Sequence, residues 1–369
     1  MAKRIGGDKW LFFTTMLLVV VGLAMVFSAS AVVAQDRYHS PYTFIGKQAL
    51  WALAGMAALL FLSRLDYSFY KSPRFIFPAF TLTTILLAMV FFFAKSNNAR
   101  RWIRLGGFSF QPSELAKLVL VLFLAWFLST RLDKINKGST LWRACIIPLV
   151  FIALIVLEPD LGTALVMAGV TAMMLFLAGL NWKFLIGGVC ALLPVLAWEL
   201  FGVSWRLQRI LVFVRFFFHP NCDLKDTGAA SYHTCQSLIA VGTGGVGGLG
   251  FMDGQQKLFF LPEPYTDFIF ANIAEEMGLI GAIFLLCLFV YFGYRGLRTA
   301  YRSQDPFARL AAFGITTAIL LQAFFNISVV LSLVPTKGIP LPLISSGGTS
   351  LAVTLAGIGV LLNITKKAD

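Results

Sequence analysis

Charged residues and histidines are scarce in this 369-residue chain, and their scarcity excludes several classes of protein. Only 13% of the residues are charged, whereas 58% are hydrophobic. A soluble domain cannot bury that much apolar surface, so the sequence predicts an integral membrane protein with lipid as its solvent. The three histidines are scattered without the spacing of metal ligands, so we expect no zinc site.

Motifs for binding nucleotides or nucleic acid are also lacking. The glycine-rich run at residues 241–250 does not end in the lysine-serine/threonine pair of a phosphate-binding loop, and no strand-to-helix context surrounds it. The run therefore favours a flexible or tightly turned loop, either re-entrant or packed on the helix tops, and we expect no nucleotide cofactor. No segment resembles a nucleic-acid-binding motif, so nucleic acid is not an expected partner.

Long apolar runs dominate what is present. A membrane-spanning helix needs about 20 mainly apolar residues, and by that measure residues 1–369 form a single all-α, polytopic membrane domain with about ten transmembrane helices. The fifth span is short, and the break at Glu158-Pro159-Asp160 could join spans five and six as a tight hairpin. One large loop, residues 204–266, separates the seventh and eighth spans. The predicted spans are 11–34, 46–63, 75–94, 113–130, 144–157, 161–179, 184–203, 267–293, 308–332 and 349–364.

Lysine and arginine in the short loops set the predicted orientation. Loops 131–143 and 295–309 are short and densely basic, which places both termini in the cytoplasm and loop 204–266 outside. The formal net charge of +13 is therefore assigned first to anchoring at the inner leaflet. Segments 95–112 and 204–266 face outward yet are also basic, so we expect an anionic ligand there. Contact with phospholipid phosphates is the open alternative.

Asp267 is the strongest candidate for chemistry. It ends the large loop at the mouth of an apolar helix, where a charge is costly unless it has a function. With Thr266 it could instead only cap that helix, since both residue types favour N-cap positions. Glu275 and Glu276 lie deeper in the same span, and two consecutive acids there are expensive unless they face a cavity or partner cations.

Two further acids and a lysine lie at the ends of other spans. Glu114 and Lys117 are three residues apart on one helix face, where they could simply pair with each other. Alternatively, Lys117 reaches Asp160, Asp267 or a phosphate of the substrate. Asp160 either caps the sixth span or faces a cavity.

Irregular and basic segments cluster on the outward side. Trp102 is flanked by Arg101 and Arg104, and its ring either stacks on a sugar or anchors at the membrane interface. The segment 334–350 is broken by proline and glycine, which is tolerated at membrane depth only inside protein or along a cavity. These segments and the large loop therefore predict one outward-facing cavity. Further basic candidates in the large loop are Arg206, Arg209 and Lys257.

Two of the five cysteines, Cys222 and Cys235, share the large outward loop. An oxidising compartment would let them pair, so a disulfide and two free thiols are both open interpretations. The other three cysteines lie in predicted spans, where they are expected to act as small core residues.

Five motifs follow one another along nearly the whole chain: Asn97-Asn-Ala-Arg-Arg-Trp-Ile103, Gln111-Pro-Ser-Glu-Leu-Ala-Lys117, Glu158-Pro-Asp-Leu-Gly-Thr163, Leu261-Pro-Glu-Pro-Tyr-Thr-Asp-Phe-Ile-Phe-Ala271 and Pro335-Thr-Lys-Gly338. In this order they resemble the SEDS family, named for shape, elongation, division and sporulation. The resemblance implies a ten-span protein of the bacterial cytoplasmic membrane that polymerises lipid II into peptidoglycan strands on the outer face. It also implies a class B penicillin-binding protein, a transpeptidase, as partner, together with other divisome or elongasome membrane proteins. Residues 257–263 and 335–338 look more like the division-type than the elongation-type members.

The resemblance also implies roles for individual residues. The essential loop aspartate of the family falls on Asp267, which would act as general base; the family's arginine-tryptophan pair falls on Arg101 and Trp102, and its span-four acid and lysine on Glu114 and Lys117. A divalent cation, Mg or Mn, is left open, with Asp267 as its candidate ligand. The chain departs from the usual family pattern at Asn98, Tyr265 and Ser346. The full set of substrate-binding candidates is Arg101, Trp102, Arg104, Glu114, Lys117, Asp160, Arg206, Arg209, Lys257 and Thr266.

Two other functions compete with a glycosyltransferase. A lipid II flippase or transporter would also need many spans and charges within the membrane, but its pathway must open to both faces. The broken segments here gather on one side. A non-catalytic scaffold for a transpeptidase would not need the carboxylate of Asp267.

Overall fold

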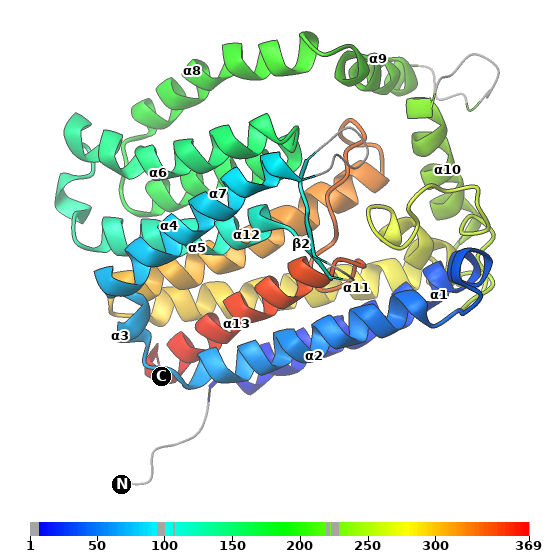
Figure 1. The fold of residues 1–369 in the computed structure, drawn as a ribbon, viewed down its shortest axis with the longest axis horizontal. Helices are drawn as coiled ribbons and strands as arrows, with labels where there is room; N and C mark the ends of the chain where they lie inside the picture. Colours follow the sequence, from blue (N-terminus) through cyan, green and yellow to red (C-terminus); the bar gives the residue numbers. More distant parts are fainter. Residues whose placement is uncertain (1–6, 94–99, 106–107, 219–221, 223–228, 369) are drawn as a thin grey trace, which may run out of the picture.

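The computed structural model describes residues 7–93, 100–105, 108–218, 222 and 229–368. Helices account for most of these residues and lie side by side in one bundle (Figure 1), which confirms the prediction of an all-helical, polytopic membrane protein. The helices are α1 (Lys9–Tyr38), α2 (Thr43–Arg64), α3 (Tyr67–Tyr70), α4 (Pro73–Met89), α5 (Pro112–Ser129), α6 (Gly138–Leu157), α7 (Leu161–Leu177), α8 (Trp182–Phe201), α9 (Ser204–Phe218), α10 (Ala229–Thr243), α11 (Ile269–Arg302), α12 (Pro306–Val330) and α13 (Gly348–Ala368), with short 3-10 turns at Val90–Phe92 and Leu132–Lys134.

Each of the predicted spans coincides with one of these helices. Within the described residues, nine helices are long and apolar enough to cross a membrane, and α7 is a shorter apolar helix of 17 residues. The expectation of a short fifth span is wrong, because α6 begins at Gly138 and has 20 residues. The eighth span is also longer than predicted, since α11 has 34 residues. The chain does reverse at Pro159, where φ is 32°, and α6 packs on α7 as a tight hairpin.

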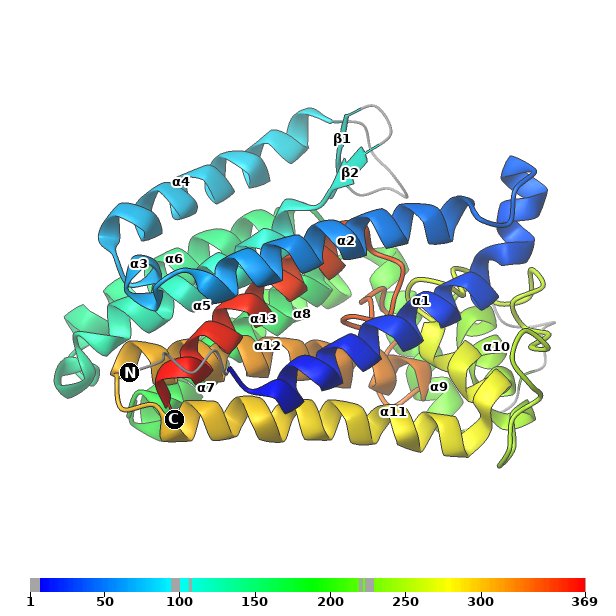
Figure 2. The same cartoon turned by 90° about the horizontal axis from the view of Figure 1, so that it is seen from below.

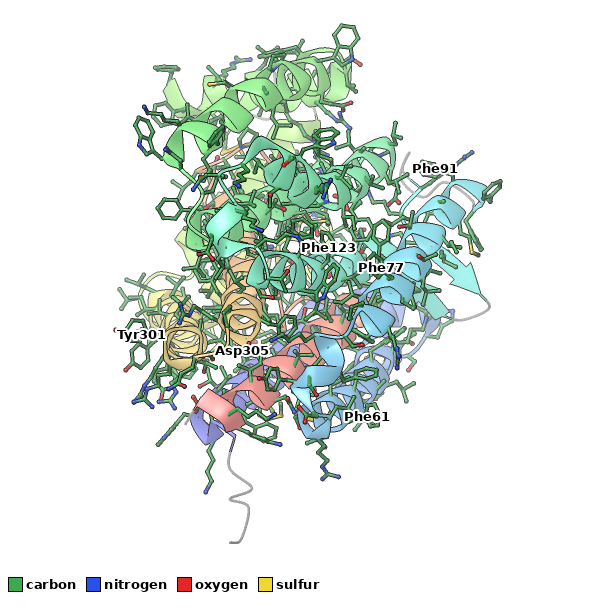
Figure 3. All side chains as sticks on the ribbon, turned by 90° about the vertical axis from the view of Figure 1, so that its left-hand side faces the viewer. Phe61, Phe77, Phe91, Phe123, Tyr301 and Asp305 are labelled. Carbon is green, nitrogen blue, oxygen red and sulfur yellow. A yellow bond between two sulfur atoms is a disulfide. The ribbon has the colours of Figure 1, made fainter. Side chains whose placement is uncertain are left out.

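The distribution of side chains is that of a protein surrounded by lipid. Viewed from the end of the bundle that carries Asp305, the aromatic residues Phe61, Phe77 and Tyr301 lie on the outer surface, whereas Phe123 of the central helix α5 is buried (Figure 3). Helix α8 is the extreme case, because none of the residues in its apolar stretch whose burial the structure describes is buried. Helices α8 and α9 run along one side of the molecule, apart from the main bundle (Figure 1). Lipid therefore has to cover α8 on most of its surface.

The glycine-rich run packs into a break in α11. At Gly278 the backbone leaves the helical conformation, with φ 64° and ψ −165°. The amides of Leu249 and Leu279 bridge the two segments, donating to the carbonyl oxygens of Glu275 and Gly245 at 3.0 and 2.9 Å. Backbone groups that the break releases from the helix therefore find partners in the glycine-rich run, as a membrane environment favours. This arrangement confirms the interpretation of the run as a tightly turned loop that packs on a helix.

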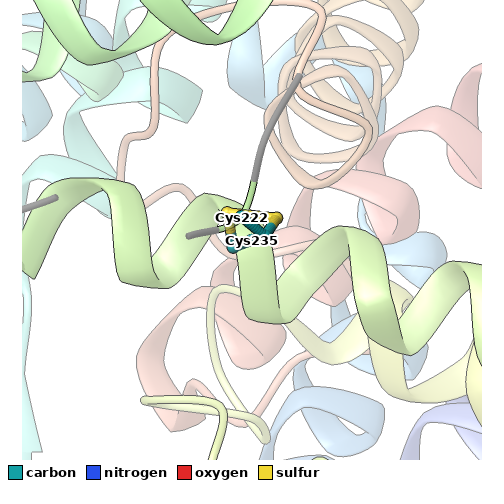
Figure 4. Close-up of a disulfide and its surroundings, with 2 residues drawn as sticks. All are labelled: Cys222 and Cys235. Carbon is teal, nitrogen blue, oxygen red and sulfur yellow. A yellow bond between two sulfur atoms is a disulfide. The ribbon is translucent and has the colours of Figure 1, made fainter. Parts of the chain in front are cut away.

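Two features of the outward segments complete the fold. Strands β1 (Ile103–Leu105) and β2 (Phe108–Phe110) pair antiparallel, with Ile103 opposite Phe110, which the all-α prediction missed. The structure joins Cys222 and Cys235 in a disulfide with a Cα–Cα distance of 5.7 Å (Figure 4), which settles the two interpretations in favour of pairing. Both termini lie at one end of the bundle, and the connection between α1 and α2 lies at the other (Figure 2).

Candidate active site

A cavity of about 780 Å³ opens near the end of the bundle opposite the termini. Its walls come from the end of α1, the first turns of α2, the β1–β2 hairpin, the α6–α7 turn and the segments around residues 263–267 and 338–350. The broken segments thus meet around one space, as the sequence predicted. Six of the predicted site residues line it, namely Arg101, Trp102, Arg104, Asp160, Thr266 and Asp267.

Asp267 is held by its backbone, which leaves its carboxylate facing the cavity. Asn326 of α12 donates from Nδ2 to the carbonyl oxygen of Asp267 at 2.8 Å and to that of Ile339 at 2.7 Å. The hydroxyl of Ser345 donates to the carbonyl oxygen of Thr266 at 2.6 Å. The N-cap position of α11 falls on Phe268, so the alternative that Asp267 merely caps this helix is wrong.

Close packing at Gly338 sets the position of the Asp267 carboxylate. A methyl group added at Gly338 would lie 2.5 Å from Oδ2 of Asp267, so only glycine permits this approach. The glycine belongs to the Pro335-Thr-Lys-Gly338 motif. That motif therefore has a packing reason to contain glycine beside the carboxylate.

The electrostatic surroundings of Asp267 bring its titration towards neutral pH. Burial is the main cause that raises the pKa of Asp267 to about 6, and the negative charges of Glu263 and Asp160 act in the same direction. Arg101 and Arg209 oppose them and favour the charged form. A carboxylate with this pKa remains mostly ionised at pH 7 but accepts a proton more readily than an ordinary aspartate, as a general base should.

Asp160 combines both of the roles that the sequence left open. It is the N-cap of α7, and its carboxylate accepts from the backbone amide of Thr163 at 3.3 Å and from its hydroxyl at 2.9 Å. It also lines the cavity, where Gln111 donates to it at 3.5 Å. Next to it, burial raises the pKa of Glu158 to about 8, so this neighbour is mostly uncharged at neutral pH.

Three cationic groups approach the site from different segments. Arg101 donates to the carbonyl oxygen of Pro159, and Arg209 of α9 donates to that of Thr336 at 3.2 Å. Lys337 follows directly, and burial lowers its pKa to about 7. We did not single out Lys337 from the sequence, although the Pro335-Thr-Lys-Gly338 motif contained it.

Glu114 and Lys117 lie apart from this cavity. They form an ion pair at 2.9 Å, and Lys117 also donates to Gln322 of α12. Both line a separate small cavity of about 40 Å³. The simpler interpretation of the sequence, a pairing between the two, is therefore the correct one. Gln322 in turn donates to the carbonyl oxygen of Pro340 at 2.9 Å, which connects the pair to the cavity wall.

The prediction that Lys257 binds substrate is wrong, because Lys257 does not line the cavity. Its ammonium group is buried, 2.6 Å from Oε1 of Glu276 and 2.9 Å from the hydroxyl of Ser28, and it does not line the cavity. A buried carboxylate such as that of Glu276 on α11 is costly without a counter-charge, and Lys257 supplies this charge. Arg206 is also buried and pairs with Glu199, which leaves it beside the site rather than in its lining.

Helix α2 supplies lining residues that we did not predict, among them Lys47, Gln48 and Trp51. Gln48 accepts from the amide of Gly347 at 3.2 Å and donates to the carbonyl oxygen of Ser345 at 3.1 Å, which fixes α2 to the segment before α13. Lys47 was a detectable signal, because a lysine at the outward end of a span opposes the usual charge bias.

Two departures from the usual family pattern meet at the edge of the cavity. The amide of Ser346 donates to the carbonyl oxygen of Tyr265 at 2.9 Å. The ring of Tyr265 packs on that of Phe44, with 4.8 Å between the centroids. The third departure, Asn98, lies outside the described residues.

The arrangement of acids bears on the open question of a divalent cation. Within the described part of the chain, no three residues among His, Cys, Asp and Glu are placed to hold a metal ion by themselves. Magnesium is often held by one or two carboxylates together with phosphates of the substrate. Asp267 fits that second kind of site, since it faces a cavity with basic side chains in its walls.

The similarity to known proteins extends over nearly the whole chain. The model of the FtsW/RodA/SpoVE family, described as cell cycle proteins, matches residues 8–369. The probable peptidoglycan glycosyltransferase FtsW of Geobacter metallireducens is 39% identical over 364 residues, which cover 98% of this chain and 95% of that protein. Stage V sporulation protein E of Bacillus subtilis is 37% identical over 380 residues, with 99% and 98% covered.

Solved structures with the same fold include two relevant cases. One is a chain from a peptidoglycan synthase complex that coordinates polymerization and crosslinking, with a TM-score of 0.80, 28% identity and 99% of both chains covered. The other is the rod shape determining protein RodA of Thermus thermophilus, with a TM-score of 0.72, 26% identity and 99% and 98% covered.

Proposed function

Because this chain belongs to the FtsW/RodA/SpoVE family of cell cycle proteins, we propose that it is a peptidoglycan glycosyltransferase that polymerises lipid II at the outer face of the bacterial cytoplasmic membrane. The observation that carries the mechanism is the carboxylate of Asp267, which faces the cavity and has its pKa raised to about 6. The cavity lies at the end of the bundle opposite both termini, which is the outer end if the termini are cytoplasmic.

In the proposed reaction, Asp267 acts as general base. It takes the proton from the 4-hydroxyl of the incoming lipid II, and the hydroxyl oxygen bonds to the anomeric carbon of the growing strand. The bond between that carbon and undecaprenyl pyrophosphate breaks, and its electron pair leaves with the pyrophosphate. A positioned base of this kind contributes on the order of 10²–10⁴ in rate. Basic side chains stabilise the charge on the leaving group.

Other lining residues position the sugars and the phosphates. Trp102 offers a ring beside Arg101 and Arg104 in the wall of the cavity, which suits stacking on a sugar next to an anion. If a divalent cation is bound, Asp267 would hold it together with the substrate diphosphate, and the ion would supply charge neutralisation. Glu114 and Lys117 connect to the wall of the cavity through Gln322 and the segment around Pro340.

The partner is a class B penicillin-binding protein that crosslinks the new strands, assisted by other membrane proteins of the division or elongation machinery. The structural likeness to a synthase complex that coordinates polymerization with crosslinking supports this pairing. The FtsW relatives support division as the process.

Polymerisation of purified lipid II in detergent tests the function directly. We expect glycan strands of increasing length on a gel, with a yield that depends on the cognate transpeptidase, and a parallel reaction with chelator tests the divalent cation. A flippase or transporter would move lipid II across vesicles without lengthening it. A scaffold would leave lipid II unchanged in every arm, and either result would contradict the proposal.

A further inference from the structure

One disulfide joins two helices that are anchored to the bundle to different degrees. In α10 the residues 234–237 are buried, and the hydroxyl of Ser237 donates to the carbonyl oxygen of Val330 at the end of α12 at 2.9 Å. In α9, among the side chains whose burial the structure describes, only that of Arg206 is buried, and it pairs with Glu199 of α8. Because α8 is itself mostly exposed, packing holds α9 much less firmly than α10.

Helix α9 supports one side of the candidate active site. Arg209 donates from Nη1 to the carbonyl oxygen of Thr336 at 3.2 Å. Gly338, in the same segment, packs so closely on Asp267 that a methyl group added there would lie 2.5 Å from Oδ2. A shift of α9 would therefore be passed through this segment to the carboxylate of Asp267.

Helix α10 supports the other side. The ring of His233 stacks on that of Phe268, with 6.1 Å between the centroids and 23° between the planes. Phe268 directly follows Asp267 and is the N-cap of α11. The bond between Cys222, just after α9, and Cys235 of α10 (Figure 4) thus closes a ring of contacts that passes through Asp267.

We propose that Cys222 and Cys235 form a redox modification site that controls the candidate active site. In the oxidised protein the disulfide locks α9 against α10, and both supports of Asp267 stay in place. In the reduced protein α9 can leave α10, and the segment that carries Gly338 loses one of its supports. The effect on catalysis rests on the proposed function, whereas the effect on α9 does not.

The oxidant of this pair is a protein with a reactive disulfide in the outer compartment. Cys222 is half-buried and Cys235 is buried, so the thiolate of Cys222 attacks first and forms a mixed disulfide with the oxidant. The thiolate of Cys235 then attacks the sulfur of Cys222, and the oxidant leaves as a dithiol. Two electrons and two protons pass from the cysteine pair to the oxidant.

The bond matters because so little else holds α9. Closing a loop with a sequence separation of 13 residues favours the closed arrangement by on the order of 10²-fold in the chain-entropy model. Without the bond, α9 depends on the noncovalent contacts of its own side chains. Reduction should therefore increase the fraction of molecules in which α9 has moved away, and we expect those molecules to polymerise slowly.

Reduction of the folded protein tests the inference without a mutation. With excess dithiothreitol, we expect kcat for lipid II polymerisation to fall about tenfold, within the bias set by the closed loop, and to recover on reoxidation with oxidised glutathione. Mass spectrometry after alkylation verifies the redox state of the pair. Cys222→Ser/Cys235→Ser should show the low rate with or without dithiothreitol. The matched control Cys190→Ala/Cys287→Ala removes two free, exposed thiols and should keep both the rate of the parent and its response to reduction.

Hydrogen exchange of the backbone amides follows α9 without relying on turnover. On reduction, exchange in α9 should rise at least about tenfold, because local opening no longer has to overcome the closed loop. Exchange in α12 should stay unchanged, since buried side chains hold that helix. Unchanged polymerisation after verified reduction, or unchanged exchange in α9, would overturn the inference.

The failures of the two proposals are distinguishable. If the oxidised parent polymerises lipid II and the reduced parent does so equally fast, the redox site is wrong and the glycosyltransferase stands. If the oxidised parent does not polymerise lipid II with its transpeptidase, the proposed function is wrong. The exchange of α9 on reduction would still show in that case whether the disulfide locks this helix.

Discussion

Two groups of acids, one just before α11 and one within it, are built in opposite ways. Glu276 is buried and fully paired, because it accepts from Lys257 at 2.6 Å, from the hydroxyl of Ser28 at 2.6 Å and from the amide of Met252 at 3.1 Å. Asp267 faces a cavity, and burial together with the negative charges of Glu263 and Asp160 raises its pKa by more than the nearby arginines lower it. Both are costly charges at the edge of an apolar helix, yet only one of them is neutralised by its surroundings.

The contrast separates an acid that holds the fold from the acid that we propose as the general base. Glu275 belongs with Glu276, because it accepts from the amides of Gln255 and Gln256 at 2.8 and 3.1 Å. Together the pair fixes the end of the large loop to α11, and the chain between these anchors carries Asp267. Paired carboxylates in the helix, with a carboxylate of perturbed pKa in a cavity just before it, are the arrangement expected where structure positions a reactive group.

Replacing Asp267 should have the largest effect on activity. Asp267→Asn keeps the shape of the side chain but removes the base, so we expect polymerisation to fall by about 10²–10⁴-fold. The thermal midpoint in detergent should stay near that of the parent, because the hydrogen bond from Asn326 goes to the backbone carbonyl of residue 267 and is kept in the variant. A variant that is stable, correctly inserted and as fast as the parent would remove Asp267 from the mechanism.

Glu276→Gln should show the opposite pattern, with stability lost and chemistry kept. It leaves the buried ammonium group of Lys257 without its counter-charge, a change that costs about 3–5 kcal/mol. The thermal midpoint should fall strongly, while the rate per folded molecule remains within a fewfold of the parent. The double variant Glu276→Leu/Lys257→Met removes both charges and should regain most of the stability. If Glu276→Gln melted like the parent, the pair would not be an anchor.

Gly338→Ala tests how tightly the carboxylate is positioned. The added methyl group would lie 2.5 Å from Oδ2 of Asp267, so the side chain or the segment must shift. A displacement of about 1 Å at a reacting group can cost about 10²-fold in rate, and we expect a loss of up to that size. Gly187→Ala in α8 is the control, because an added methyl group there meets nothing within 4 Å. Equal activity of the two variants would show that the close approach of Gly338 to Asp267 does not affect catalysis.

The sequence was sufficient for the features that depend on local chemistry. Apolar length predicted the membrane helices, and a costly carboxylate at a helix mouth pointed to Asp267. It could not identify the partner of Lys257, because Ser28 and Glu276 meet it only through packing of α1 on α11. Lys337 was missed for the same reason, since the cations around it come from distant segments. Position along the chain shows that a charge exists, whereas only the fold shows what surrounds it.

The smallest expected effect comes from changing the charges around Asp267, and it is best seen in the pH dependence of kcat/KM. A general base must be ionised, so kcat/KM should fall as the pH drops through about 6, the raised pKa of Asp267. Glu263→Gln removes a negative charge that raises this pKa, so the carboxylate becomes a stronger acid and the acidic limb should move to lower pH. Asp133→Asn, at an exposed acid near the other end of the bundle, should leave the limb in place. If the acidic limb does not move in Glu263→Gln, a group other than Asp267 titrates there. The negative charge that raises the pKa of Asp267 most would then have been removed without effect.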